Sequence, residues 1–247
     1  MRIAEGLEAL DIPMNVNNPA NLIYPALLWD EKHAILVDTG LPGTAPRIRE
    51  AMESAGVPLQ KLTHVILTHQ DVDHIGGLMG LLELLDHPIE VLAHEIERPY
   101  IEGEKPLIKW KPERLDAMFE ALPEPQREEA KARFSAALKA KVDRTVVDGE
   151  VLPYCGGIQI VYTPGHTPGH MSLYIRSSKT LLAGDAMVAP GGQLQGPNPT
   201  VTPDMDTAMK SIGKLASLDI EAILCYHGGL VRGGIRERLA KLTVSTH

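Results

Sequence analysis

Cysteine is scarce in this chain, and no hydrophobic run in it is long. The 247 residues include two cysteines, Cys155 and Cys225, which cannot form the framework of a disulfide-stabilised domain. We expect both to be buried thiols in a reducing compartment. The longest stretches without charge, residues 12–29 and 186–203, are interrupted by polar residues, proline and glycine, so neither is expected to span a membrane.

Basic charge is also in deficit. The chain carries 24 Lys and Arg against 32 Asp and Glu, a formal net charge of −8 at pH 7. A surface that binds duplex nucleic acid needs a basic face, so we expect no nucleic-acid partner. The first residues include Glu5 and Glu8 and lack the apolar segment of a signal peptide. We therefore expect a cytoplasmic protein without a membrane partner.

Several motifs with well-defined chemistry are missing. The sequence contains no G-x-S-x-G, no Walker A motif, no G-x-G-x-x-G and no C-x-x-C. It therefore lends no support to a serine nucleophile, a P-loop, a Rossmann dinucleotide site or a thiol-redox centre.

Apolar runs and helical stripes follow one another in both halves of the chain. The apolar runs predict strands at 34–38, 64–67, 89–92, 157–162, 171–175, 180–183 and 222–225. Helical spacing predicts helices at 44–55, 75–85 and 205–218, and a last one with Val231, Ile235, Leu239 and Leu242 on one face. Strands followed by helices in each half predict an α/β fold, an αββα sandwich of two mixed β-sheets flanked by helices.

Residues 95–143 differ from the rest. They hold 11 acidic and 10 basic residues together with both phenylalanines and Trp110. Two amphipathic helices are expected here, one from Pro112 and one after Pro125. We interpret the segment as a helical insertion in a single domain spanning 1–247. It is either an edge cap on the core or a functional element, namely a substrate-binding lid or the arm of a homodimer.

Histidine and aspartate recur where predicted strands end. Four segments share this pattern: T-H-Q-D-V-D-H-I-G-G at 68–77, T-P-G-H-T-P-G-H at 163–170, A-G-D at 183–185 and C-Y-H-G-G at 225–229. Alone, each segment is also compatible with a polar turn or a structural histidine. Together they place imidazoles and carboxylates at the same kind of location four times, which predicts a metal centre.

The order of these segments resembles that of the metallo-β-lactamase superfamily. The spacings of 92, 19 and 42 residues between His74, His166, Asp185 and His227 agree with its pattern. Asp38-Thr39-Gly40 is similar to the turn that precedes the first helix of that family. The resemblance covers nearly the whole chain. The subgroup of the superfamily that the chain resembles includes glyoxalase II-like thioesterases and acyl-homoserine lactonases.

The resemblance implies two divalent metal ions per chain with a hydroxide between them. Carried onto this sequence, the family pattern assigns metal one to His69, Asp71 and His166, metal two to Asp73, His74 and His227, and the bridging position to Asp185. Asp73 is also the residue expected to take part in catalysis. Asp38 and His170 are expected to support the ligand loops through hydrogen bonds.

One residue departs from the family motif H-x-H-x-D-H, because Asp71 stands in place of its second histidine. As a ligand, Asp71 would bring the carboxylates to three, so that with the hydroxide they balance the charge of two divalent ions. Zn is the expected metal, with Mn or Fe as alternatives because oxygen ligands favour harder ions. The other interpretation is a mononuclear site in which Asp71 is not a ligand.

The resemblance therefore predicts a metal-dependent hydrolase whose metal-bound hydroxide attacks a small-molecule ester, lactone or thioester. One alternative is a mononuclear iron oxygenase acting on a thiol or persulfide, since His69, Asp71 and His166 resemble the 2-His-1-carboxylate triad. Another is a non-catalytic scaffold whose metal only stabilises the fold or is sensed.

Overall fold

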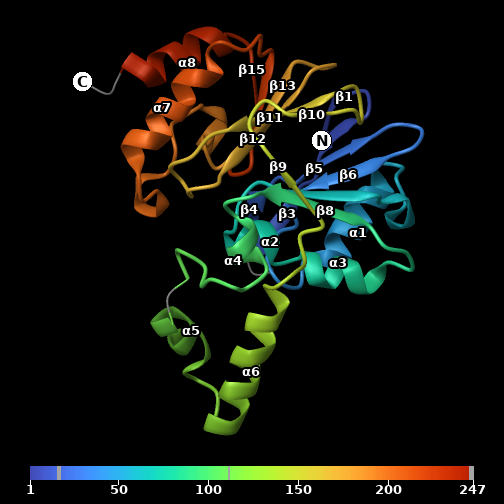
Figure 1. Ribbon diagram of the computed structural model, residues 1–247, viewed down its shortest axis with the longest axis vertical. Coiled ribbons are helices and arrows are strands. Elements are labelled where there is room, and N and C mark those ends of the chain that lie inside the picture. The colour runs from blue at the N-terminus through green and yellow to red at the C-terminus, as the bar shows by residue number, and fades with distance from the viewer. Residues whose placement is uncertain (16–17, 111, 245–247) are drawn as a thin grey trace.

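The computed structural model describes residues 1–15, 18–110 and 112–244 (Figure 1). Seven strands form the first sheet, in the order β1-β2-β5-β6-β7-β8-β9. They are β1 (Arg2–Ala4), β2 (Leu7–Ala9), β5 (Ala26–Trp29), β6 (Ala34–Val37), β7 (His64–Leu67), β8 (Glu90–His94) and β9 (Arg144–Val146). The pairs from β6 to β9 are parallel and the others antiparallel, so the sheet is mixed.

Six strands form the second sheet, paired in sequence order. They are β10 (Val151–Leu152), β11 (Ile158–Tyr162), β12 (Met171–Ile175), β13 (Thr180–Gly184), β14 (Ala222–Cys225) and β15 (Gly229–Arg232). Within this second sheet, β13 and β14 pair in parallel and the other neighbouring strands pair antiparallel. A separate two-stranded sheet joins β3 (Ile12–Asn15) to β4 (Asn18–Ile23).

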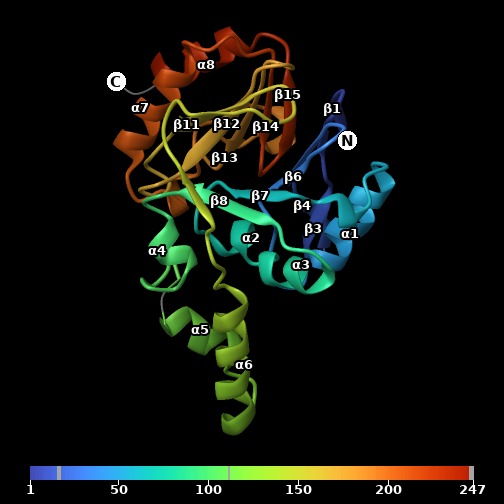
Figure 2. The same cartoon turned by 45° about the vertical axis from the view of Figure 1, so that its right-hand side comes forward.

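Three hydrophobic cores separate four layers. The first lies between the first sheet and the helices α1 (Ala45–Ser54) and α3 (Leu78–Leu84). The second lies between the two sheets, where Ile66 of β7 and Leu173 of β12 are fully buried. The third lies between the second sheet and the helices α7 (Met205–Leu215) and α8 (Ile235–Val244). The predicted αββα sandwich is confirmed (Figure 2).

Strands β7, β12 and β13 are buried at every position. Each is covered by a helix layer on one face and by the other sheet on the opposite face, so both faces need apolar side chains. This explains why these strands are mostly apolar in the sequence and do not alternate between apolar and polar residues.

The segment between β8 and β9 leaves the sandwich. It contains α4 (Arg98–Ile101), α5 (Pro112–Phe119) and α6 (Glu124–Ala137). The helices α5 and α6 project away from the two sheets and contact each other (Figures 1 and 2). Phe134 of α6 stacks on Trp110 and meets Phe119 edge-on, with ring centroids 5.2 and 6.0 Å apart, so the aromatic side chains of this segment hold its own helices together.

Two predicted elements have other bounds in the structure. The helix predicted at 75–85 begins at Leu78 as α3, and a separate short helix, α2 (Val72–Ile75), precedes it. The helical stripe places Val231 on the last helix, but this residue lies in β15. The residues Gly233 and Gly234 that follow both have positive φ, which ends the strand and lets α8 begin at Ile235.

The remaining elements are short. The hydrophobic pattern does not predict strands β1 to β5, which are three to six residues long and interrupted by proline and glycine. Three 3₁₀ turns lie at Leu59–Lys61, Pro190–Gly192 and Pro199–Val201. Among the described residues, no helix is both long enough and apolar enough to cross a membrane.

The inter-sheet core makes a first prediction. Leu173→Ala should lower the free energy of unfolding by about 2–5 kcal/mol, because it leaves a cavity between the sheets. Urea denaturation measures this loss. Met118→Ala on α5, where the side chain is 55% exposed, is the control and should change stability by less than about 0.5 kcal/mol. Equal losses in the two variants would contradict the layered core.

Candidate metal centre

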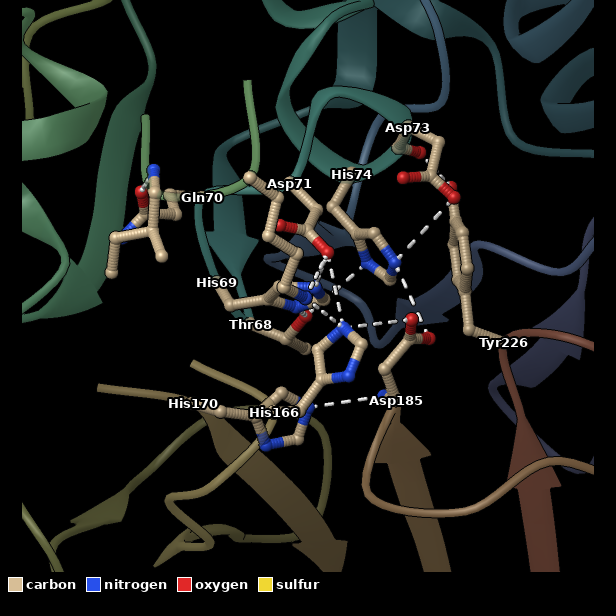
Figure 3. Close-up of polar contacts among 12 residues, drawn as sticks. Thr68, His69, Gln70, Asp71, Asp73, His74, His166, His170, Asp185 and Tyr226 are labelled. Atoms are coloured by element: carbon tan, nitrogen blue, oxygen red, sulfur yellow. Dashed lines mark hydrogen bonds and ion pairs between the residues drawn. The ribbon is translucent and has the colours of Figure 1, made fainter. Parts of the chain in front are cut away.

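The four segments that carry histidine and aspartate meet at one edge of the two sheets. Residues 68–77 follow β7, residues 163–170 follow β11, Asp185 follows β13, and His227 follows β14 after one intervening residue. Strands β13 and β14 are parallel, and β11 has the same direction because β12 lies antiparallel between β11 and β13. Their carboxyl ends therefore face the same edge. Figure 3 shows the side chains pointing toward one another.

The loop 68–77 turns sharply after β7. Asp71 is the N-cap residue of α2, but its side chain makes no capping hydrogen bond, so the carboxylate is directed to the site instead. Gly77 has no room for a side chain, because a Cβ there would collide with the carbonyl oxygen of Thr39. This close approach sets α2 against the turn formed by residues 38–40. The loop is therefore more than a solvated turn with polar caps.

The turn Asp38-Thr39-Gly40 holds His74 at two points. Oδ2 of Asp38 accepts a hydrogen bond from Nδ1 of His74 at 2.8 Å. The backbone N–H and the hydroxyl of Thr39 both donate to the carbonyl oxygen of His74, at 2.7 and 2.8 Å. Asp38 is buried and has a φ of 62°, which is uncommon for a residue with a side chain. The turn thus fixes both the backbone and the ring of His74.

The candidate ligands form two clusters. The first consists of His69, Asp71, His166 and Asp185, and the second of Asp73, His74 and His227, with the ligand atoms of each within 4.8 Å of one another. Asp185 faces both clusters. Its Oδ2 is 3.1 Å from Nε2 of His166, while its Oδ1 is 3.4 Å from Nε2 of His74 and 3.6 Å from Nε2 of His227. All seven candidates from the sequence are brought together.

Two imidazoles donate a hydrogen bond from Nδ1 to groups that lie behind the clusters. Nδ1 of His74 donates to Asp38. The Thr68 hydroxyl also donates to Asp38, at 2.8 Å, and therefore accepts from Nδ1 of His69 at 3.0 Å. Among the described residues, Nε2 of each ring is buried without a hydrogen-bond partner and is directed to the clusters, and Oδ1 of Asp185 is likewise buried without a partner.

His166 follows the same rule. The Thr202 hydroxyl donates to the backbone of Asn198, so its oxygen accepts from Nδ1 of His166 at 3.1 Å. Nε2 of His166 then faces Oδ2 of Asp71 at 3.0 Å and Oδ2 of Asp185 at 3.1 Å. A ring nitrogen and carboxylate oxygens this close are stable only with positive charge between them, either a proton on the ring or a metal ion in its place. The imidazole and carboxylate donors of both clusters therefore fit divalent metal ions.

The ionisation of the site reflects the same demand for positive charge. Burial by itself lowers the pKa of His74, but Asp38, Asp185 and Asp73 outweigh it and hold that pKa well above its usual range. Burial by itself raises the pKa of Asp185, yet His74 and His166 bring it well below its usual range. Asp185 therefore favours its charged form, and the site attracts positive charge.

One cation of the chain itself lies in the first cluster. Nζ of Lys109 is 2.6 Å from Oδ2 of Asp71 and 2.6 Å from Nε2 of His166. Lys109 lies between α4 and α5, at the start of the segment that projects from the sandwich. The sequence motifs do not indicate it, because an isolated lysine carries no signal of where the chain places it.

Glu97 is a second residue that the motifs miss, and it connects the ligand loops. Its Oε2 accepts from the backbone and side-chain amides of Gln70 at 2.9 and 3.0 Å, and its Oε1 accepts from the N–H of Gly169 at 2.6 Å. Oε1 of Gln70 accepts from the N–H of Ile108 at 2.8 Å. One buried network thus joins both ligand loops to the segment that carries Lys109.

His170 lies behind Asp185 and contributes no ring nitrogen to either cluster. Its Nε2 accepts from the backbone N–H of Asp185 at 3.0 Å, so its Nδ1 carries the proton and donates to the carbonyl oxygen of Thr163 at 3.1 Å. Burial lowers the pKa of His170 to about 3, so the ring is neutral. Its contacts place the backbone of Asp185.

Tyr226 precedes His227 but does not face the open side of the site. Its hydroxyl donates to the carbonyl oxygen of Asp73, and its ring lies against that of His74 with centroids 3.8 Å apart. Tyr226 is buried and supports the loop that carries these two residues.

The fold and the site agree with a known family. Residues 22–227 match the metallo-beta-lactamase superfamily, and the chain belongs to it. The probable metallo-hydrolase YflN of Bacillus subtilis (strain 168) is 32% identical over 237 residues, which cover 91% of this chain and 84% of that protein. The hydroxyacylglutathione hydrolase GloC of Haemophilus influenzae is 28% identical over 218 residues, covering 86% and 89%.

A solved structure of the same family is similar throughout. The metallo-beta-lactamase family protein TTHA1429 from Thermus thermophilus superimposes with a TM-score of 0.70 and 25% identity, over 99% of this chain and 80% of that one. This chain is therefore a member of a metallo-hydrolase superfamily and carries two candidate metal-binding clusters.

The contact between Asp38 and His74 makes a second prediction. Asp38→Asn places an amide where two oxygens now accept from Thr68 and His74, so the His74 ring loses its charged partner. We expect Zn²⁺ affinity to fall about 10–100-fold, measured by competition with a chromophoric chelator. Asp86→Asn, whose side chain is 79% exposed, is the matched control and should leave affinity unchanged. Unchanged affinity in Asp38→Asn would show that the turn does not orient a ligand.

Proposed function

We propose that this protein is a metal-dependent hydrolase that cleaves an ester, lactone or thioester, with Zn²⁺ as the expected ion. The observation that carries the proposal is the convergence of imidazole and carboxylate groups in two clusters, with buried Nε2 atoms on His69 and His74 that no described residue hydrogen-bonds. Family membership and the metallo-hydrolase name of one relative support it. The name of another relative, hydroxyacylglutathione hydrolase, specifies an acyl derivative of glutathione and so favours thioesters within this group.

A divalent ion, when bound, supplies a water of lowered pKa and a Lewis acid that polarises the substrate carbonyl. The exposed fractions of the side chains show from which side substrate can reach the clusters. Side chains of Asp73 and His227 are 21% and 30% exposed, whereas those of His69 and His166 are almost fully buried. We assign the approach of substrate to the side of Asp73 and His227.

Asp73 is the residue we assign to proton transfer. Its Oδ2 lies 3.1 Å from Nε2 of His227, and its carboxylate is the most exposed of the three in the two clusters. A carboxylate at this position can hold the proton given up by the attacking water and pass it to the leaving group. His227 orients that carboxylate through their contact.

The iron oxygenase interpretation is less well supported. It needs open coordination positions at the triad of His69, Asp71 and His166. The ammonium of Lys109 lies between two members of that triad. Oxygen uptake with thiol substrates would favour the oxygenase. Metal binding without turnover of any ester, lactone or thioester would favour a scaffold.

The proposed hydrolysis makes a third prediction. His74→Ala and Asp185→Ala should each lower kcat/KM by at least about 10³-fold, because His74 faces two carboxylates of the clusters and Asp185 faces imidazoles of both clusters. Activity is measured on a panel of one activated ester, one lactone and one acyl thioester, with Zn²⁺ present.

His87→Ala is the control for these variants, because the side chain of His87 is 33% exposed and lies outside both clusters. Its activity should equal that of the unaltered protein. His170→Ala should show an intermediate loss of about 10–100-fold, since it affects only the support of Asp185. If the zinc-loaded protein hydrolyses no member of the panel, the proposed function is wrong.

A further inference from the structure

The ammonium of Lys109 lies where a cation is needed by the first cluster. Its two contacts of 2.6 Å reach Asp71 and His166, two of the four residues of that cluster. A lysine ammonium has donors only, so Nε2 of His166 must accept from it. This agrees with the proton of His166 being on Nδ1, toward Thr202.

The backbone beside Lys109 is fixed to the same site. The N–H of Ile108 donates to Oε1 of Gln70, and Gln70 is held by the buried carboxylate of Glu97. Gln70 lies between the ligand candidates His69 and Asp71 in the sequence. The hydrogen bond that Ile108 donates to the ligand loop therefore positions the backbone next to Lys109, so the place of the ammonium does not depend on its side-chain contacts alone.

The charges of Asp71 and Lys109 offset each other. Where the family motif has a neutral imidazole, Asp71 adds one negative charge, and Lys109 adds one positive charge 2.6 Å from it. The two side chains are 15% and 17% exposed, so water screens the pair only in part. A divalent ion in the first cluster would have to displace this ammonium or bear its repulsion.

The carboxylates that face the second cluster have different partners. Across residues 1–15, 18–110 and 112–244, the ion pairs of Asp73 run only to His74 and His227. Those of Asp185 run only to His74, His166 and His227 in the same described part of the chain. The two clusters therefore differ in what a metal ion must displace.

We propose that Lys109 is a built-in competitor for one of the two metal positions. The second cluster binds a divalent ion first, and the first cluster binds one only after the Lys109 ammonium has moved away from Asp71 and His166. The flexible four-carbon stem and the 17% exposure of the side chain give the ammonium a path to water. This inference rests on the proposed metal binding and adds that the two positions are unequal.

The test compares Zn²⁺ binding by the unaltered protein, Lys109→Met and Lys105→Met. Equilibrium dialysis against buffered free Zn²⁺, followed by elemental analysis, measures both equivalents. We expect the unaltered protein to bind the second equivalent at least about 100-fold more weakly than the first, and Lys109→Met to remove most of that difference. Lys105 lies in the same segment, beside the ring of Tyr100, and its substitution should change nothing.

The outcomes separate this inference from the proposed function. If the unaltered protein binds two equivalents with equal affinity, or if Lys109→Met leaves the difference intact, Lys109 is not a competitor and the hydrolase proposal stands. If none of the three proteins binds Zn²⁺, both proposals are wrong.

A second measurement needs no variant. Acetic anhydride acetylates accessible amines, and mass spectrometry reports the extent at Lys109 relative to Lys105. Without metal and with one equivalent of Zn²⁺, Lys109 should be protected by its contacts with Asp71 and His166. Excess Zn²⁺ should raise its acetylation several-fold. Acetylation of Lys109 that is independent of Zn²⁺ would overturn the inference.

The pairing with Asp71 adds one further comparison. Asp71→His restores the family motif but leaves the ammonium among imidazoles without its carboxylate partner. The double variant Asp71→His/Lys109→Met should therefore bind the second Zn²⁺ more tightly than the two single effects together imply. Additive effects would mean that the two residues are not coupled.

Discussion

The structure of the site depends on buried imidazole and carboxylate groups that face one another and need positive charge between them, either as a ring proton or as a metal ion. Nε2 of His74 and Oδ1 of Asp185 are both buried, 3.4 Å apart, and no residue that the structure describes forms a hydrogen bond with either of them by distance and angle. Such an arrangement is unfavourable unless positive charge is supplied, because burial removes the water that would otherwise screen it. The requirement for positive charge is therefore a property of the folded chain, because contacts behind the rings decide which nitrogen of each histidine faces the clusters.

The fold creates this arrangement through contacts behind the ligands. Parallel strand ends bring the loops to one edge of the sheets. Asp38 accepts a hydrogen bond from the ring of His74, and Glu97 joins the two ligand loops. His170 holds the backbone of Asp185 in the same way. Each of these supporting residues is buried, so a substitution of any of them displaces a metal-ligand candidate that is itself unchanged.

The pair formed by Asp71 and Lys109 shows how a change in a family motif is accommodated. A carboxylate in place of an imidazole adds buried negative charge, which is costly without a partner. The partner comes from the projecting segment, whose start is tied to Gln70 in the ligand loop itself. This segment thus takes part in the site through residues 108 and 109, while its helices α5 and α6 contact each other at a distance from the sheets (Figure 2).

The sequence by itself determined the sandwich and the ligand candidates. Strands buried on both faces must be apolar throughout, and the loops that follow them carry His69, His74, His166 and Asp185 at family spacings, so both features can be recognised locally. Element ends were less secure: Val231 carries the helical stripe but lies in a strand, because the two glycines after it decide where the helix begins.

Only the tertiary structure decided which other groups reach the site. Lys109 and Glu97 are ordinary charged residues in the sequence, and their roles arise because residues 27 to 72 positions away in the chain become hydrogen-bond partners. The direction of each ring proton likewise depends on a hydroxyl or carboxylate from another loop. Long-range contacts of this kind follow from how the chain returns on itself, which no local pattern of residues records.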